Sequence, residues 1–315
     1  MTIALCGNHK VIYCTESELA WTLEQMGHTV LRLQENTVST NDMLTLCRQH
    51  HVSLFLYVHT HGWKTPGTFP MEELIGALRA EEIPTASFHL DLYWGLGQHH
   101  REAWVGQHPF WQTDRVFTAD GGHQSKFEAR GVRHQWLPPA VAARHCYRGN
   151  ICPEYDFDVI FVGSRKYHAE YPFRERLIQW LERTYHRRFR RFGGDCGGVV
   201  REGRLNDLYA SAKVVVGDSC FAGSPFYWSD RVPETLGRGG FLIHPATEGL
   251  NIEGLATFPA RDLETLKGLI DHHIQNPEAR HVCTERAMTD VRLHHTYTQR
   301  MEVVLAVMRH VYARH

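Results

Sequence analysis

The sequence predicts an α/β protein made of two doubly wound, Rossmann-like domains, each with a parallel sheet covered by helices on both faces. The chain has 315 residues, a length that suits two domains of about 150 residues each. Short apolar runs alternate along it with amphipathic helical stretches, which is the pattern of parallel α/β folds. One loop-like segment, beginning at Leu137-Pro138-Pro139, interrupts this alternation, which then restarts.

In the first half, we expect strands where short apolar runs are bounded by turn residues, and helices where apolar residues recur every three or four positions. The run Val52–Val58 is continuously apolar, which is typical of a strand buried on both faces. Thr40 or Asn41 is the expected N-cap of the second helix. The expected strands are Thr2–Leu5, His28–Leu33, Val52–Val58, Thr85–Leu90 and Arg115–Thr118, and the expected helices are Glu16–Met26, Asn41–His50 and Met71–Ala80.

The second half repeats the alternation. We place the domain boundary in the loop-like stretch from Leu137 to Pro153. This gives an N-terminal domain (1–150), a C-terminal domain (151–295) and a last helix (296–315) expected to pack back toward the N-terminal domain. The expected strands are Asp158–Val162, Phe189–Phe192, Lys213–Gly217 and Gly240–His244, and the expected helices are Phe173–Thr184, Leu205–Ser211, Asp230–Gly237, Asp262–Ile274, Pro277–Thr289 and Tyr297–Val311.

Composition argues against several classes of protein. The formal net charge is -1 with histidine neutral, so no global basic field draws the chain to nucleic acid or to an anionic membrane. No apolar stretch approaches roughly 18 residues, so no membrane span is expected, and the first residues lack the pattern of a signal peptide. The eight cysteines contain no Cys-x-x-Cys pair and are expected to be reduced thiols. We therefore expect a cytoplasmic protein.

The most informative segment runs from Ser229 to Ile243. A polar loop there leads into a short helix capped by Ser229 or Asp230, and the helix ends at glycines before the next strand. A helix N-terminus at the carboxyl end of a parallel sheet favours a phosphate group. Glu234 lies one turn into the helix, where a carboxylate can accept both hydroxyls of a ribose. A solvated glutamate on an exposed helix face fits these residues equally well, so physical reasoning alone leaves both interpretations open.

This segment resembles the C-terminal half of GT-B glycosyltransferases, most closely the CgeB-like branch of spore-maturation glycosyltransferase-like proteins. The resemblance rests on an Arg-x-x-Glu-x-Leu-x-x-Gly-Gly-Phe-Leu pattern from Arg231 to Leu242, with further matches at 158–164, 277–280 and 295–300. It covers roughly residues 85–310. It implies a GT-B fold, in which two Rossmann-like domains face a cleft. It also implies an enzyme that transfers a sugar from a nucleotide-sugar donor to a hydroxyl acceptor on a glycan, a protein or a small molecule.

The resemblance also implies which residues bind the donor. Glu234 corresponds to the acid that binds the donor ribose, and the residues at the start of its helix would face the diphosphate. The loop after the first strand of the second domain would bring backbone amides and a cation, Arg165 or Lys166, to phosphate or sugar. The implied donor-binding residues are Glu234, Arg231, Ser229, Gly163, Ser164, Arg165, Gly239 and Gly240.

The resemblance further implies that no metal ion and no cofactor is needed besides the donor, which we take to be a UDP-sugar. Side chains and helix dipoles carry the phosphate charge in such enzymes. Many retaining relatives have a second glutamate eight residues before the ribose-binding one. Phe226 occupies that place here, which leaves the stereochemistry of transfer open.

An inverting transfer needs a base that takes the acceptor proton. Asp91 is the first candidate, because it follows an expected strand and sites form at the carboxyl ends of parallel strands. A loop-capping aspartate is the alternative. His59 and His61, at the end of the neighbouring strand, compete for the role, since a histidine pKa near about 6.5 suits proton transfer; structural histidines are an equally good interpretation. The pair could also bind a metal, but its spacing alone is weak evidence and no metal site is expected.

The run His186-Arg187-Arg188-Phe189-Arg190-Arg191 is the strongest local basic patch. Basic residues around an aromatic side chain can bind nucleic acid, which fits phage enzymes that glycosylate hydroxymethylated bases in DNA. A DNA acceptor is therefore an alternative, although a solvated helix end followed by an edge strand is the simpler interpretation. A non-catalytic nucleotide-sugar-binding protein and a sugar-nucleotide epimerase on the same scaffold also stay open.

Overall fold

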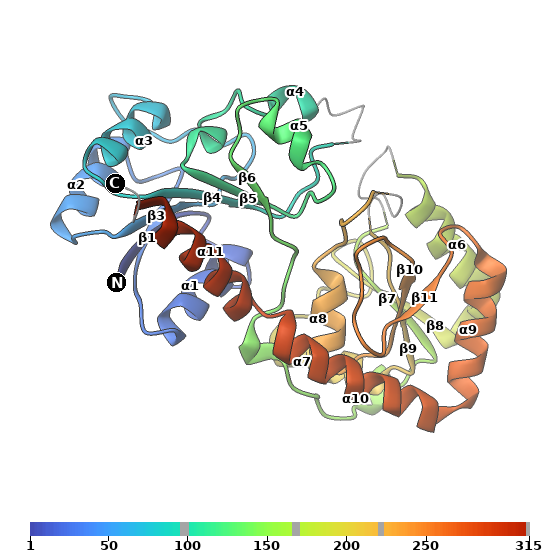
Figure 1. Cartoon of the computed structure of the whole chain (residues 1–315). Helices are drawn as coiled ribbons and strands as arrows, with labels where there is room; N and C mark the ends of the chain where they lie inside the picture. Colours follow the sequence, from blue (N-terminus) through green and yellow to red (C-terminus); the bar gives the residue numbers. More distant parts are fainter. Residues whose placement is uncertain (95–100, 166–170, 220–223, 313–315) are drawn as a thin grey trace. The chain divides into compact units, whose positions relative to one another are not determined.

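The structure is a computed structural model that describes residues 1–94, 101–165, 171–219 and 224–312. It consists of two compact units (Figure 1). The first unit contains Met1–Pro138 together with Tyr297–His315, and the second contains Pro139–Thr296. Each unit has its own parallel sheet and helices, as the sequence predicts.

Within the described residues, the first unit has a six-stranded sheet in the order β2-β1-β3-β4-β5-β6. All neighbouring strands are parallel. The chain moves outward from β1 to β2 and then returns past β1 to β3, which makes the sheet doubly wound. The strands are β1 Thr2–Gly7, β2 Thr29–Gln34, β3 Leu54–Tyr57, β4 Thr85–His89, β5 Arg115–Thr118 and β6 His134–Trp136.

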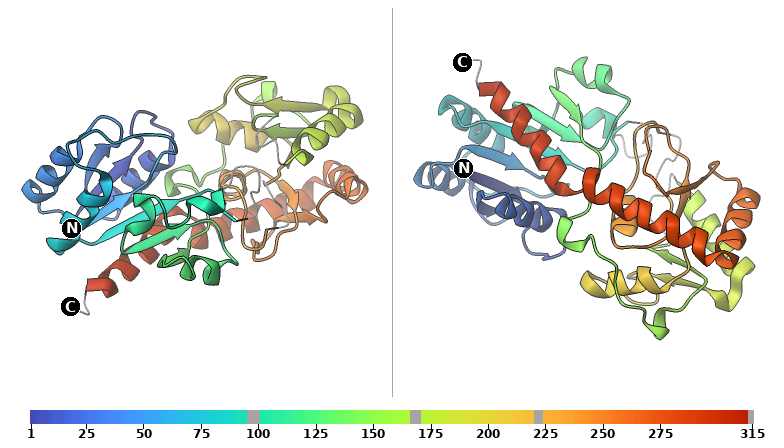
Figure 2. Two further views of the ribbon diagram at one scale, coloured as in Figure 1. Left: turned by 90° about the horizontal axis from the view of Figure 1, so that it is seen from above. Right: turned by 60° about the horizontal axis from the view of Figure 1, so that its bottom comes forward.

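The helices of the first unit come from both ends of its sequence. The last helix, α11, packs against α1, and the two lie side by side in both views (Figure 2). The N-cap of α2 is Ser39, whose Oγ accepts a hydrogen bond from Asp42 N at 3.1 Å, so the expected cap at Thr40 or Asn41 is wrong by one residue or two. The helices are α1 Thr15–Gln25, α2 Thr40–Gln49, α3 Met71–Ala80, α4 Arg101–Trp104, η1 Pro109–Gln112, α5 Gln124–Glu128 and α11 Tyr297–Tyr312.

The second unit has a five-stranded parallel sheet among its described residues, in the order β11-β10-β9-β7-β8. Helix α10 packs on α8, and α9 packs on β9, β10 and β11. The strands are β7 Val159–Val162, β8 Phe189–Phe192, β9 Val214–Val216, β10 Leu242–Pro245 and β11 Ala256–Phe258. The helices are η2 Ala143–His145, η3 Pro153–Tyr155, α6 Phe173–Tyr185, η4 His186–Arg188, α7 Glu202–Ser211, α8 Arg231–Gly237, α9 Leu263–Gln275 and α10 Pro277–His294.

The two units divide between Pro138 and Pro139, twelve residues before the end of the expected domain 1–150. The segment 139–150, between these two points, is hydrogen-bonded to helix α7 of the second unit. Asn206 on α7 donates from Nδ2 to the carbonyl oxygens of His145 at 2.9 Å and Tyr147 at 2.7 Å. Asn150 N donates to Asp207 Oδ1 at 2.7 Å. Buried polar groups need such partners, and here the partners come from α7.

Besides the short 3-10 helices η1 to η4, the elements α4, α5, β6 and β11 were not expected from the sequence. Strands β6 and β11 span only His134–Trp136 and Ala256–Phe258, too few residues for a period-two pattern to show. Among the described residues, no helix is long and apolar enough to cross a membrane.

Candidate active site

Most of the residues expected to carry chemistry lie at the carboxyl edge of one of the two sheets. In the first unit, strand alternation brings Glu35, Tyr57 and His59 together. Successive side chains of a strand point to opposite faces, so Tyr57 and His59 share one face and continue beyond the end of β3. Glu35 follows the last residue of β2 and is fully buried. The three side chains meet on the face that Cys6 of the intervening strand also occupies, since Cys6 pairs with Tyr57 in register.

The contacts of Glu35 define the protonation of His59. Tyr57 donates its hydroxyl to Glu35 Oε1 at 2.8 Å, and burial together with Glu35 raises the pKa of Tyr57 well above its usual range, so the phenol keeps its proton. His59 Nδ1 also contacts Glu35 Oε1, and Thr60 N donates to Glu35 Oε2 at 2.9 Å. A carboxylate can only accept. The arrangement therefore places the imidazole proton on Nδ1 and the lone pair on Nε2.

His59 Nε2 is buried, and within the described residues it has no hydrogen-bond partner. The rings of His61 and His108 are its neighbours, with ring centroids 5.6 and 5.5 Å from that of His59. An imidazole whose Nδ1–H is held by a carboxylate and whose Nε2 lone pair has no partner is the arrangement of a general base. The sequence singled out His59, but nothing in it pointed to Glu35, which is 24 residues away in sequence.

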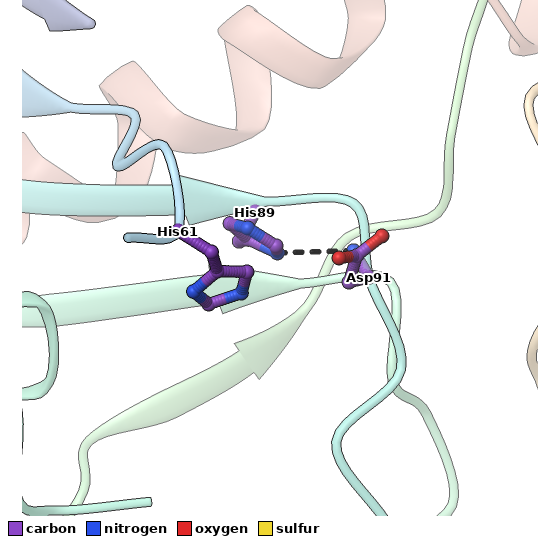
Figure 3. A group of neighbouring side chains, drawn as sticks. All are labelled: His61, His89 and Asp91. Carbon is purple, nitrogen blue, oxygen red and sulfur yellow. Dashed lines mark hydrogen bonds between the residues drawn. The ribbon is translucent and has the colours of Figure 1, made fainter. Parts of the chain in front are cut away.

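His61, His89 and Asp91 form a second group at the ends of β3 and β4 (Figure 3). The rings of His61 and His89 have centroids 4.6 Å apart, and Asp91 N donates to His89 Nδ1 at 3.1 Å. Burial lowers the pKa of His61 to about 3 and also lowers the pKa of His89. Both imidazoles are therefore neutral at neutral pH.

Asp91 is held by a cation. Its Oδ2 accepts from Arg101 Nη1 at 2.7 Å. Burial alone would raise the pKa of Asp91, but His89 and Arg101 outweigh it and the pKa lies below its ordinary value. A carboxylate with a lowered pKa is a weak base. Asp91 is thus less suited than His59 to remove an acceptor proton, contrary to the order expected from the sequence.

The same three residues could suggest a metal site, because each has a ligand atom within 4.8 Å of the others. Tetrahedral zinc with ligands at about 2.1 Å needs ligand atoms roughly 3.4 Å apart. Two of the three residues also have hydrogen-bond partners already, since Asp91 accepts from Arg101 and His89 accepts from a backbone N–H. Because the backbone N–H of Asp91 donates to His89 Nδ1, neutral His89 carries its proton on Nε2, and neither nitrogen has a free lone pair. The group fits the hydroxyls of a polar ligand better than an ion.

Asp120, after β5, anchors the loop that carries Asp91. It is fully buried, and its Oδ2 accepts from the backbone of Tyr93 at 2.8 Å and Trp94 at 2.9 Å. Burial raises its pKa to about 7 despite these two hydrogen bonds. Oδ1 has no hydrogen-bond partner within the described residues. No local pattern in the sequence points to Asp120.

In the second unit, Gly163 and Arg231 meet at the carboxyl end of β7. Arg231 donates from Nε to Val162 O at 2.9 Å, and from Nη1 to Asp218 O at 2.8 Å and Asp218 Oδ1 at 3.2 Å. Gly163 has φ of +146°, and a Cβ there would lie 2.7 Å from Arg231 Nη2. Only glycine lets the backbone and the guanidinium approach so closely.

Asp218, fully buried after β9, links two arginines. Arg174 on α6 donates from Nε to both of its carboxylate oxygens at 3.0 Å, and Arg231 bonds the same residue. Nearby, Ser229 N donates to Ser219 Oγ at 2.8 Å, and Ser219 Oγ lies 2.9 Å from His244 Nε2. These bonds tie the ends of β9 and β10 to the start of α8 and fix Arg231 in place.

Other donor residues expected from the sequence have partners of their own. The Arg165 guanidinium pairs with Glu182 on α6, and Arg165 N donates to Asp195 Oδ2 at 3.2 Å. Ser229 Oγ donates to Asp230 Oδ1 at 2.9 Å. Ser164 is half-buried in the same loop as Gly163. Lys166 lies outside the described residues.

Glu234 faces α7. Its Oε2 accepts from Arg238 Nε at 2.6 Å, and Arg238 Nη1 donates to Asn206 Oδ1 at 2.6 Å. Burial raises the pKa of Glu234, although Arg238 opposes the shift. The Glu234 side chain is 23% exposed, so part of it stays accessible to a ligand.

Gly239 and Gly240 are not at the carboxyl edge. They end α8 and precede β10, so they lie at the opposite, amino end of that strand. Gly239 has φ of +83°, and a Cβ there would contact Arg148 and Met288; one on Gly240 would contact Thr235 and Tyr209. The glycines serve the turn and its close packing, and a role in donor binding stays a prediction.

Comparison with known proteins indicates the class of protein to which these two units belong. Residues 166–306 match a family model described as glycosyl transferase-like. No curated protein matches the chain.

Solved structures resemble the whole chain. HepE from Anabaena in complex with UDP is 12% identical, with a TM-score of 0.59 over 98% of this chain and 100% of that one. An alpha-glucosyltransferase in complex with UDP-glucose and DNA containing an abasic site is 10% identical, with a TM-score of 0.69 over 98% and 99%. Sucrose-phosphate synthase from Thermosynechococcus elongatus is 11% identical, with a TM-score of 0.66 over 100% of both.

At these identities the structural similarity establishes the fold, which is GT-B. The fold and the glycosyl transferase-like match together support the class of the protein as a glycosyltransferase.

Proposed function

We propose that the protein transfers a sugar from a UDP-sugar, bound by the second unit, to a hydroxyl acceptor bound by the first. We assign it to the CgeB-like branch of these enzymes on the sequence pattern from Arg231 to Leu242. We also assign it to the cytoplasm, because the cysteines within the described residues are free thiols, as in a reducing compartment.

The observation that carries the donor assignment is the Gly163–Arg231 contact. Nε and Nη1 of Arg231 donate hydrogen bonds at the ends of β7 and β9. Nη2 lies beside Gly163, which has no side chain. A guanidinium fixed by its neighbours can stabilise the charge that grows on a departing diphosphate without reorganising. This positioned cation takes the place of a metal ion bridging the phosphates, so transfer proceeds without one.

Glu234 binds the donor ribose in this proposal. It lies three residues after Arg231, so the two side chains are neighbours on one face of α8. Its Oε2 accepts from Arg238, which leaves Oε1 to accept ribose hydroxyls. Arg238 keeps the carboxylate oriented, and the partial exposure of the side chain allows contact.

His59 is the proposed base. Nε2 takes the proton of the acceptor hydroxyl, the acceptor oxygen forms a bond to the anomeric carbon, and the bond from that carbon to the UDP oxygen breaks. Glu35 stabilises the imidazolium that forms. Asp91 and the His89 Nε2–H supply an acceptor and a donor for the other hydroxyls of the acceptor molecule.

The experiment is to incubate the protein with a panel of labelled nucleotide sugars in EDTA and to follow nucleotide release and sugar conversion. A transferase hydrolyses its donor slowly without acceptor, and we expect UDP release from one UDP-sugar at a rate that EDTA leaves unchanged. Conversion of the sugar with the nucleotide still attached would instead identify an epimerase. Binding without release would identify a non-catalytic protein.

A further inference from the structure

A large basic groove lies in the first unit, at the amino edge of the sheet. The cavity measures about 1540 Å³. Its walls are the residues that precede β5 and β6 on one side and Ala306, Val307 and His310 of α11 on the other. Strand β5 is four residues long, so at about 3.3 Å per residue the groove lies roughly 13 Å from the carboxyl edge that carries Asp120 and Asp91.

The lining of the groove is positively charged. It includes Arg79, Arg115, Arg130 and Arg133, whereas Asp114 and Glu82 are its acidic members among the described residues. Asp114 is buried and already satisfied, because Arg79 Nε donates to Oδ1 at 3.0 Å and Thr85 donates to Oδ2 from N at 2.9 Å and from Oγ1 at 2.8 Å. Apart from the Arg79–Asp114 pair, the described lining has three guanidinium groups and one carboxylate. These belong to Arg115, Arg130, Arg133 and Glu82.

Arg115 and Arg133 are the cations with capacity for a ligand. Arg130 donates to Glu102 O at 2.8 Å and stacks over Trp94. In contrast, the Nε of half-buried Arg115 has no hydrogen-bond partner in the described part of the chain. That Nε is itself buried, but the half-buried Arg115 side chain lines the groove and makes no hydrogen bond or ion pair among the described residues, so its terminal N–H groups remain for an acceptor in the groove. Arg133 is exposed.

The size and chemistry of the groove indicate the occupant. Small-ligand pockets usually measure about 300–1,000 Å³ and are mainly apolar, whereas this groove is larger, open and basic. Guanidinium groups bind phosphate oxygens in bidentate fashion. Trp111, the aromatic residue of the lining, is only 5% exposed, so it offers little surface for base stacking. The lining therefore fits a phosphate backbone rather than exposed bases.

We propose that this groove binds the phosphate backbone of nucleic acid, independently of base sequence. The basic run expected to do so from the sequence is less suited. Arg188 pairs with Asp158, and Arg191 pairs with Asp195 at 2.5 Å. Arg187 and Arg190 remain exposed there, and they provide a matched control with the same loss of charge.

The test is fluorescence anisotropy of a labelled 20-base-pair duplex and of the corresponding single strand, without donor, in 50 to 200 mM NaCl. The groove variant is Arg115→Gln with Arg133→Gln, and the control is Arg187→Gln with Arg190→Gln. We expect the groove variant to bind about tenfold more weakly or worse. Its slope of log K against log salt should fall by roughly 1.8, which is about 0.9 for each lost phosphate contact. The control should bind as the wild type does.

Several results would overturn the proposal. They are an absence of binding by the wild type, a loss in the control as large as in the groove variant, and tighter binding of polyglutamate than of DNA. Arg133→Gln alone, at an exposed position, guards against misfolding of the double variant and should give about half of the change in slope. Because no donor is present, failure here leaves the transferase proposal untouched.

Discussion

At the residue scale, the account depends on the environment of single side chains. His59 and Asp91 are both at the carboxyl edge of one sheet, but their partners differ. His59 is held by a carboxylate, and its buried Nε2 is unpaired within the described parts of the chain, whereas His89 and Arg101 lower the pKa of Asp91. The nature of the partner, more than the position at the strand end, determines which residue can accept a proton.

His59→Gln should abolish the base but keep the hydrogen bond to Glu35. We expect kcat to fall by about 10²–10⁴-fold, the usual contribution of a general base, while the dissociation constant for UDP stays within about twofold because the donor binds the other unit. Steady-state kinetics and calorimetry measure both. His281→Gln, at an exposed histidine of α10, is the control, and equal kinetics in the two variants would remove His59 from the mechanism.

Asp120 should make stability depend on pH. Its folded pKa of about 7 exceeds the unfolded value of about 3.9, so the folded state binds the proton more tightly. The resulting stabilisation is present below about pH 4 and is lost as the pH rises through 7. Between pH 5 and 8 the wild type should lose about 3 kcal/mol of unfolding free energy relative to Asp120→Asn. Urea titrations of both proteins at the two pH values measure this, and parallel pH dependence would contradict it.

At the element scale, the sequence predicts the strands and helices with long apolar patterns and the two-sheet architecture. It misses contacts that depend on strand order. Glu35 and His59 meet because β1 lies between β2 and β3, an arrangement that no local pattern encodes. It does not distinguish the roles of Gly239 and Gly240, because a glycine that ends a helix and one that lies against a phosphate look alike in sequence.

The loop after β7 yields a prediction at this scale. Gly163→Ala places a methyl group 2.7 Å from Arg231 Nη2 in a backbone conformation that alanine avoids. We expect UDP binding to weaken about tenfold or more, because Arg231 must move. Gly27→Ala also has positive φ but nothing within 4 Å, so it should lose only stability, by about 1–2 kcal/mol. Calorimetry with UDP separates the two, and unchanged affinity in Gly163→Ala would contradict the donor assignment.

At the scale of the whole molecule, the first unit is built from both ends of the chain. Helix α11 contributes fully buried Met301 to it, and Arg300 Nε donates to Pro138 O at 2.7 Å. The sequence indicates a separate last helix, but it does not show which strands or helices that helix covers, because the contact joins residues almost 300 positions apart.

Met301→Ala should therefore destabilise the first unit by about 2–5 kcal/mol, the range for truncating a buried methionine. Val303→Ala, on the same helix at a 38% exposed position, should change stability by less than about 1 kcal/mol. Thermal unfolding followed by circular dichroism compares them. Equal melting temperatures would show that α11 does not stabilise this unit.

We propose that the diphosphate of a UDP-sugar binds against Gly163 and Arg231. A crystal structure of the protein with UDP tests it most directly. The account predicts diphosphate oxygens within hydrogen-bond distance of Arg231 Nη2 and the ribose against Glu234. A nucleotide found elsewhere, with the Gly163–Arg231 contact unoccupied, would contradict it.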